Sequence, residues 1–206
     1  MNPETVVEQG SPEWHRLRAR KITASEMGCV LAKPTTKRHG TYFMQKFRAF
    51  SYGELPDDSP KPWHQHGLKY EKFARSMCSL FLNSDIRECG IFVNPAADFM
   101  SASPDGVIEN QNSGIEIKCR SSLSAHEKTK YAGKCPPEYM PQVQTQIICG
   151  GFDHVWFASF YVNPDDPDDN DLFLVKVNPD EKYIEKIYAA SFDFWAKLQT
   201  KLENGK

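Results

Sequence analysis

The sequence predicts an α/β or α+β fold in which helices flank a central mixed β-sheet. Apolar and polar residues alternate strictly from Gly114 to Lys118, a pattern typical of a strand with one buried face. An aromatic-rich run from Val155 to Val162 and an apolar run from Leu172 to Val177 predict two further strands. Apolar residues recur at helical spacing over two long segments, Trp63 to Phe81 and Asp180 to Leu202. Helices that precede, separate and follow strands are typical of this fold class.

Capping residues mark two further helix starts near the N-terminus. Ser11 and Pro12 suit the N-cap and the first helical position of a short helix. Thr23 and Glu26 have the spacing of a capping box, which predicts a helix over Met27 to Leu31. The other predicted elements, in chain order, are a helix over Tyr42 to Phe50, a loop over Ser51 to Pro62, a strand over Ile86 to Asn94, a polar helix over Ser121 to Ala132 and a helix over Glu138 to Cys149.

Length and charge restrict the possible classes of protein. A chain of 206 residues suits a single domain over residues 1–206, and 40% hydrophobic content can fill a sizeable core. The net charge of -2 gives no global positive field toward nucleic acid. Residues 1–50 nevertheless contain nine Lys and Arg against four Glu. A DNA-binding surface is therefore permitted but not required.

The cysteines and the N-terminus indicate the compartment. Six cysteines are scattered along the chain without a CxxC pair, which favours a reduced interior and argues against a structural zinc site. The N-terminal segment lacks the apolar stretch of a secretory signal, and no apolar run approaches membrane-spanning length. We therefore expect a soluble cytosolic protein with no membrane contact.

The segment from Ser101 to Arg120 carries the residues best suited to catalysis. Asp105 follows a proline, and Glu116 and Lys118 lie on one face of the predicted strand. The polar loop from Glu109 to Ser113 would fold this strand back beside Asp105. Two carboxylates can hold a hard divalent cation, and a nearby lysine can orient or deprotonate a water that attacks phosphorus. The arrangement therefore predicts phosphodiester hydrolysis.

The spacing alone leaves other interpretations open. The triplet Asp180-Glu181-Lys182 repeats the acid and lysine spacing, but it follows a strand and a proline and suits the first turn of a helix. Glu116 and Lys118 could equally form an ion pair on a solvated face. Glu71 on its predicted helix reads by itself as a surface carboxylate. Residues 16–21 add basic side chains near a helix N-terminus, where an anion is favoured.

Several sequence blocks together resemble a known family. Pro104-Asp105 followed by Glu116-Ile117-Lys118 resembles the PD-(D/E)xK nuclease motif. The ordered blocks VEQGSPEWHRLRARKITASE, GLKYEKFAR, SPDG, IEIK and MPQVQTQ resemble the phage lambda-type exonucleases, which include the YqaJ-like viral recombinases. The resemblance covers nearly the whole chain. It implies a restriction-endonuclease-like core, with the central mixed sheet flanked by helices.

The resemblance also implies an activity and its partners. It implies a Mg²⁺-dependent, processive 5′→3′ exonuclease that releases 5′-mononucleotides from linear double-stranded DNA and leaves a 3′ single strand. Such an enzyme would form a homotrimeric ring, work with a single-strand annealing protein in recombination, and be encoded by a phage or prophage in the bacterial cytosol. Two alternatives remain: a restriction or repair endonuclease on the same core, and a catalytically weak DNA-end-binding protein.

The same resemblance implies roles for individual residues around the metal. Asp105 and Glu116 would coordinate two Mg²⁺ ions, for which Mn²⁺ can substitute, with help from the Ile117 backbone carbonyl. Lys118 would contact the attacking water. Glu71 would lie beside the metal site, in contrast to its reading as a surface acid.

A second set of implied residues would bind the DNA. Arg18 would bind the 5′-phosphate of the end being shortened. Thr23, Ser25 and Ser103 would place hydroxyls around phosphates, and Gln144 would lie near the active site. Arg20 and Lys21 add two positive charges that would line the DNA path or simply solvate the surface; the sequence does not decide between these.

Overall fold

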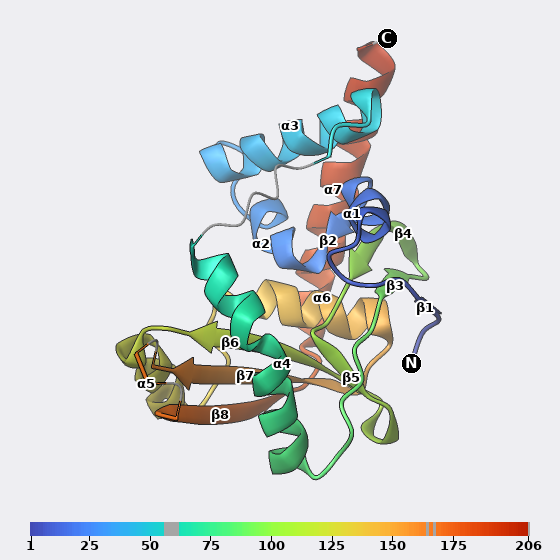
Figure 1. Cartoon of the computed structure of the whole chain (residues 1–206). Helices are drawn as coiled ribbons and strands as arrows, with labels where there is room; N and C mark the ends of the chain where they lie inside the picture. The colour runs from blue at the N-terminus through green and yellow to red at the C-terminus, as the bar shows by residue number, and fades with distance from the viewer. Residues whose placement is uncertain (56–61, 164, 167, 206) are drawn as a thin grey trace.

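The strands divide between two four-stranded sheets that lie on either side of helix α6 (Met140–Gly150) (Figure 1). The computed structural model describes residues 1–55, 62–163, 165–166 and 168–205. Residues 56–61 of the predicted loop therefore lie outside the described residues. Both sheets are mixed, and the predicted α/β class is confirmed. The strands are, however, shared between two sheets, whereas the sequence predicted one.

The larger sheet carries the predicted hairpin. Its order is β5 (Gly106–Ile108), β6 (Ser113–Arg120), β7 (His154–Val162) and β8 (Asn170–Val177). β5 and β6 pair antiparallel around the short 3-10 turn η2 (Glu109–Gln111), as the polar loop predicted. β6 and β7 run parallel, and β7 and β8 run antiparallel. β5 pairs only with Ser113 to Ile115, so the second half of β6 extends beyond its partner on that side.

The smaller sheet brings the N-terminal segment to the strand that leads to Asp105. Its order is β1 (Glu4–Thr5), β3 (Ile91–Asn94), β4 (Ala97–Ala102) and β2 (Ile22–Thr23). β2 runs parallel to β4, with Thr23 opposite Ser101. Residues of the N-terminal block are therefore held a few residues upstream of Asp105, although about 80 positions separate them in the chain.

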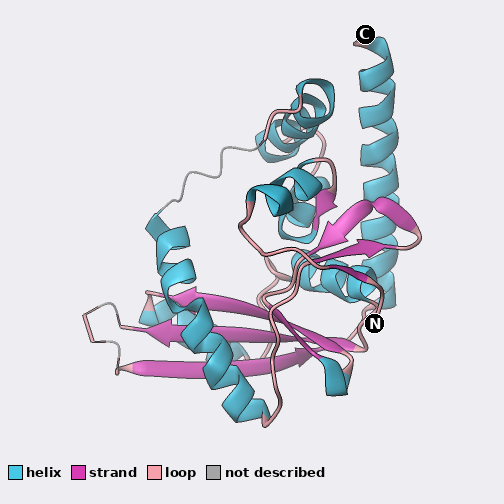
Figure 2. Ribbon diagram, turned by 45° about the vertical axis from the view of Figure 1, so that its right-hand side comes forward, coloured by secondary structure: helices cyan, strands magenta, loops and turns pink. Residues whose placement is uncertain are grey.

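Helices cover both faces of the larger sheet. α4 (Pro62–Leu82) lies across one face, as Figure 2 shows, and packs Tyr70, Ala74 and Cys78 onto Ile115 and Ile117. α5 (Leu123–Ala132) and α6 lie against the other face. Alternate residues of β6 therefore enter different environments: the isoleucines face α4, and Glu116 and Lys118 face the opposite way.

The remaining helices pack around the C-terminal helix. α1 (Pro12–Ala19), α2 (Met27–Val30) and α3 (Lys37–Tyr52) lie on the side of the smaller sheet, and α3 crosses α7 (Glu181–Asn204) (Figure 1). The ring of Phe194 on α7 lies 5.2 to 5.6 Å from the rings of His39, Tyr42 and Phe43. Among the described residues, no helix combines the length and apolar character needed to cross a membrane.

The predicted capping box at Thr23 is wrong. Thr23 makes no side-chain cap, and a 3-10 turn, η1 (Ala24–Glu26), precedes the four-residue helix α2. The N–H of Thr23 donates to the hydroxyl of Tyr42, and the Glu26 carboxylate accepts from the Cys29 thiol. Pairing with β4 holds Thr23 in a strand, so tertiary contacts take the groups that a local cap would have used.

Other predicted boundaries shift without changing the element. The Ser11 hydroxyl caps α1 by accepting from the N–H of Trp14. The strand predicted over Ile86 to Asn94 forms only from Ile91, with Arg87 making an isolated bridge to Val107. The helix predicted over Tyr42 to Phe50 extends in both directions, and the other predicted helices and strands differ at their ends by a few residues.

We predict that Phe194→Ala lowers the free energy of unfolding by about 3–5 kcal/mol, because it leaves a cavity among packed aromatic rings. Phe194 is 1% exposed. Urea denaturation followed by circular dichroism measures the change. Phe192→Ala on the same helix is the control, since that ring is 48% exposed and its loss should cost about 1 kcal/mol or less. Equal effects of the two substitutions would contradict the packing described for α7.

Candidate active site

Asp105 is fixed against β6 by two hydrogen bonds. Its N–H donates to the Ile115 carbonyl at 2.9 Å, and its carboxylate accepts from the N–H of Ile117 at 2.6 Å. The side chain of Gln9 donates to the carbonyl of Pro104 at 2.8 Å and holds the preceding turn. Asp105 thus lies just before the first residue of β5, at the point beyond which β6 continues without that partner, next to Glu116.

Glu116 projects from β6 toward α6 and is almost completely buried, at 1% exposure. One of its oxygens accepts from Gln142 Nε2 at 2.7 Å, and the other accepts from Gln146. Lys118, from the same face of β6, forms an ion pair with the first oxygen. A buried carboxylate is tolerated only with such partners, because burial removes its hydration. The glutamines and the lysine therefore set its orientation.

Arg75 of α4 ties a third carboxylate to this centre. Its guanidinium donates to Glu71 at 2.7 Å, to the carbonyl of Asp105 at 2.8 Å and to Glu88. Glu71 is therefore brought beside the Asp105 turn, as the resemblance implied. The sequence analysis did not single out Arg75. Its position four residues after Glu71 on a helix is a signal that could have identified it.

The carboxylates interact strongly with one another. Burial, and then the negative charges of Glu116 and Glu71, raise the pKa of Asp105 well above its usual range. Burial and the charge of Glu116 also raise the pKa of Glu71, although Arg75 opposes the shift. Burial alone would lower the pKa of Lys118, but Glu116 and Asp105 outweigh it and raise that pKa. Lys118 is therefore a cation at neutral pH, in a site with more carboxylates than cations.

The donor set fits a hard divalent cation. Within the described residues, no three His, Cys, Asp or Glu side chains converge as a ready-made metal cluster. Mg²⁺ does not require one, because it commonly takes one or two carboxylates and completes its shell with water and substrate phosphate. Burial and then repulsion by Glu116 and Glu71 raise the pKa of Asp105, and a cation between Asp105 and Glu116 would relieve both effects. These two carboxylates are the residues that could hold the metal.

A second polar group lies at the N-terminal block and reaches the Asp105 turn. The Arg18 guanidinium lies 3.9 Å from the Trp14 ring centroid and donates to the Ser25 hydroxyl at 3.0 Å. The indole N–H of Trp14 donates to the Ser103 hydroxyl at 3.2 Å, and Thr23 and Ser25 share a hydrogen bond of 3.4 Å. The four predicted phosphate-binding residues are therefore brought together, and Trp14, which was not predicted to act here, connects them.

The chain is similar to a known family and to solved structures. The model of the YqaJ-like viral recombinase domain matches residues 13–153. The chain belongs to this family. It is also similar to the crystal structure of an alkaline exonuclease from Laribacter hongkongensis, with a TM-score of 0.81 and 27% identity over 94% of this chain and 95% of that one. The structure of that exonuclease in complex with dAMP gives a TM-score of 0.82.

A curated relative extends beyond the matched region. An uncharacterised protein of Acanthamoeba polyphaga mimivirus is 28% identical over 183 residues, which is 84% of this chain. The chain spans about a third of the length of that relative, since the match covers 32% of it. A phage-related exonuclease from Haemophilus somnus shares the fold, with a TM-score of 0.65 at 16% identity.

One residue implied for this YqaJ-like domain, Gln144, does not lie at the carboxylates. Its side chain is fully buried, donates to the Asn178 carbonyl at 2.9 Å and accepts from the N–H of Asp180 at 3.0 Å. Residues 142 and 146 are one turn apart on α6 and face Glu116, whereas residue 144 is turned by about 200° from 142. The assignment of Gln144 to DNA binding is therefore wrong, and Gln142 and Gln146 take the place near the site.

The remaining basic residues of the block are distinguished by their contacts. Lys21 donates to the Asp98 carbonyl at 2.6 Å and so ties the end of α1 to the smaller sheet. Lys46 is buried and donates to the carbonyls of Arg18 and Ala19 at 3.2 and 3.0 Å, which orients the end of the helix that carries Arg18. Arg20 is exposed.

The triplet Asp180-Glu181-Lys182, which repeats the acid and lysine spacing of β6, lies at the start of α7. Asp180 accepts a hydrogen bond from the N–H of Tyr183, as expected for a helix start.

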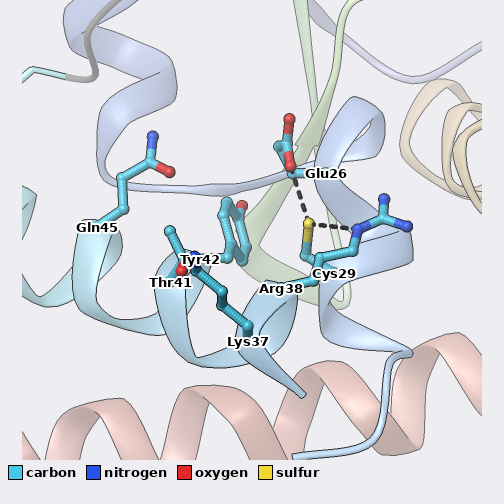
Figure 3. A pocket seen from close by; sticks show the side chains of 7 residues that line it. All are labelled: Glu26, Cys29, Lys37, Arg38, Thr41, Tyr42 and Gln45. Carbon is cyan, nitrogen blue, oxygen red and sulfur yellow. Dashed lines mark hydrogen bonds between the residues drawn. The ribbon is translucent and has the colours of Figure 1, made fainter.

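A pocket opens beside η1 and α3. Figure 3 shows the Cys29 thiol between Glu26 and Arg38, with hydrogen bonds of 3.0 Å to each. Burial, and then the hydrogen bond to Glu26, raise the pKa of this thiol to about 11, so it stays protonated and is a poor nucleophile. The pocket is lined by Glu26, Cys29, Lys37, Arg38, Thr41, Tyr42 and Gln45.

We predict that Asp105→Asn stabilises the metal-free protein by about 1 kcal/mol at neutral pH, because it removes a carboxylate repelled by its neighbours. The pKa of Asp105 is higher in the folded protein than in the unfolded chain. The free energy of unfolding therefore falls as the pH rises above the pKa that an aspartate has in the unfolded chain. The gain from asparagine should therefore vanish at acidic pH. Thermal unfolding in chelator at several pH values measures it.

Added Mg²⁺ provides the control for this prediction. The wild type should gain stability from the ion by mass action, and Asp105→Asn should gain less. A variant that is less stable than the wild type in chelator at neutral pH would contradict the repulsion described for this site.

Proposed function

We propose that this protein is a Mg²⁺-dependent 5′→3′ exonuclease that acts on linear double-stranded DNA and releases 5′-mononucleotides. The observation that supports this most directly is the connection between two groups of residues. Asp105, Glu116 and Lys118 form a centre suited to phosphodiester hydrolysis, and Trp14 links Ser103, two residues before Asp105, to the side chain of Arg18, which we propose binds phosphate. Similarity to an alkaline exonuclease at 27% identity supports the same reaction.

The residues of the centre have distinct roles in the proposed reaction. Asp105 and Glu116, with the Ile117 carbonyl, would hold Mg²⁺, which when bound polarises the scissile phosphate and lowers the pKa of bound water. Gln142 and Gln146 keep the Glu116 oxygens oriented. Lys118, whose raised pKa keeps it protonated, positions the attacking water and stabilises the charge that develops on phosphorus. Arg75 and Glu71 hold the Asp105 turn in place.

The Arg18 group selects the DNA end. A terminal 5′-phosphate carries more negative charge than an internal phosphodiester, and an arginine fork with nearby hydroxyls provides charge-assisted hydrogen bonds to it. The Trp14 ring limits the directions in which the Arg18 guanidinium can point, since the two lie 3.9 Å apart. A fixed spacing between this group and Asp105 would set the cut at a constant position from the end.

We further propose that the enzyme works as a homotrimeric ring, which would keep it on one DNA strand through successive cuts. A heterologous interface that closes by cyclic symmetry forms such a ring. Exposed apolar side chains on α4, with Leu68, Leu80 and Phe81 all at least 70% exposed, are consistent with a surface that packs against another subunit. The 3′ single strand left behind would pass to a strand-annealing protein in recombination.

We predict that Lys118→Gln lowers the rate of digestion of linear duplex roughly 10²–10³-fold, the contribution typical of one donor that stabilises charge in the transition state. Glutamine retains a donor for Glu116, so thermal unfolding should change little. The control is Lys182→Gln, which alters the lysine of the repeated triplet at the start of α7 and should leave the rate unchanged. The assay follows acid-soluble nucleotide release with Mg²⁺, and chelator should abolish it.

Covalently closed circular duplex tests the type of cleavage in the same assay. An enzyme that requires an end leaves the circle intact. Cutting of the circle would instead indicate a restriction or repair endonuclease. Tight binding of linear DNA without any Mg²⁺-dependent release would indicate an end-binding protein.

We predict that the wild type digests 5′-phosphorylated ends roughly 10- to 100-fold faster than 5′-hydroxyl ends, because a charged hydrogen bond contributes about 1.5–3 kcal/mol. Arg18→Ala should remove this preference by slowing digestion of the phosphorylated ends only. Initial rates on the two kinds of end measure it. A preference that persists in the variant would show that another residue binds the terminal phosphate.

A further inference from the structure

β6 presents a third functional side chain beyond the carboxylate centre. Side chains at alternate positions of a strand share a face, so Glu116, Lys118 and Arg120 project in the same direction. Glu116 and Lys118 belong to the centre described above. Arg120 follows Lys118 at the end of β6, beyond the part that β5 covers.

The aromatic ring of Tyr139 holds both cations. Lys118 Nζ and the central guanidinium carbon of Arg120 each lie 5.2 Å from the centroid of that ring. Tyr139 is the N-cap residue of α6, the helix that also carries the glutamines bound to Glu116. A cation over an aromatic face is attracted by the ring quadrupole. The position of Arg120 is therefore linked to the same elements that orient the catalytic carboxylate.

Arg120 nevertheless lacks the partners that a structural arginine has. Within the described part of the chain, Arg120 has no ion pair, and its Nε is buried without a hydrogen-bond partner. Lys118, its neighbour on the ring, is paired with Glu116. A buried donor left unsatisfied costs about 1–3 kcal/mol, and buried polar groups are usually bonded. No hydrogen bond or ion pair within the described residues engages the guanidinium of this half-buried arginine, so its terminal Nη donors are available to an anion.

The chemistry of the guanidinium indicates what kind of anion fits. Nε is buried and out of reach of a ligand, but the two terminal Nη groups form an end with two parallel N–H donors, which matches two oxygens of one phosphate. Two residues along a strand span about 6.6 Å, which is comparable to the separation of successive phosphates in a DNA strand. A phosphate at Arg120 would therefore neighbour the phosphate that is attacked beside Lys118.

We propose that Arg120 is a substrate-binding residue that holds the backbone phosphate adjacent to the scissile one. The assignment of that position rests on the proposed nuclease function. With Arg18 at the DNA end and Arg120 next to the cut, the strand is held on both sides of the reacting phosphorus. The contact carries no base specificity, because it is made to the backbone alone.

The test measures binding of a 5′-phosphorylated duplex at several salt concentrations, with Ca²⁺ in place of Mg²⁺ to prevent cutting. Arg120→Gln should weaken binding roughly tenfold and reduce the slope of log K against log salt by roughly 0.7–0.9, as expected for one lost phosphate contact. Arg120→Lys should retain the slope and lose affinity, because lysine keeps the charge but not the two-donor edge. Lys186→Gln, an exposed residue of α7, is the charge-matched control and should change neither quantity.

A modified DNA locates the contact. One uncharged methylphosphonate at the phosphate next to the scissile one should weaken binding of the wild type and have little additional effect on Arg120→Gln, because the two changes remove the same interaction. Additive effects of the two changes would overturn the assigned position. If Arg120→Gln unfolds at the same temperature as the wild type and has the same slope of log K against log salt, Arg120 does not contact a phosphate.

These outcomes separate the inference from the nuclease function. If the wild type digests linear duplex and Arg120→Gln binds DNA as the wild type does, the inference fails and the function stands. If the wild type cuts no DNA but the salt slope falls in Arg120→Gln alone, the function fails and the phosphate contact stands.

Discussion

Burial of the Glu116 carboxylate is the constraint on which the rest of the structure depends. An ionised carboxylate at 1% exposure is stable only when hydrogen bonds and an opposite charge replace its hydration. Lys118 from the same strand and two glutamines from α6 provide these partners. α6 must therefore lie against β6 in one rotational phase. This requirement places the helix between the two sheets and determines which side chains reach the centre from either side.

The site combines groups that stabilise the fold with groups that oppose it. Arg75 bonds both Glu71 and the Asp105 backbone and thereby fixes the turn between the two sheets. Asp105 itself is buried and is repelled by the neighbouring carboxylates, and burial and repulsion together raise its pKa. Active sites commonly retain such repulsion where function requires it and compensate for it through packing elsewhere. Here the aliphatic contacts of Ile115 and Ile117 with α4 hold β6 in position.

The group around Arg18 lies close to the carboxylates in space and far from them in the sequence. Trp14 and Ser103 are 89 positions apart and share a hydrogen bond of 3.2 Å. The parallel pairing of β2 with β4 makes this contact possible, because it aligns the N-terminal block with the strand that enters the Asp105 turn. The two groups of residues that carry the proposed end recognition and hydrolysis are therefore held in one rigid frame rather than on independent loops.

The sequence by itself determined the local features of this protein. Period-two alternation identified β6 and the shared face of Glu116 and Lys118, helical periodicity identified α4 and α7, and the polar loop identified the hairpin, because these patterns depend on neighbours in the chain. Only the tertiary structure decided that Gln142 and Gln146 rather than Gln144 meet Glu116, since that depends on the rotation of α6 about its axis. It also revealed Arg75 and Trp14 and divided the strands between two sheets. Those features arise from contacts across the fold, which no local pattern of residues encodes.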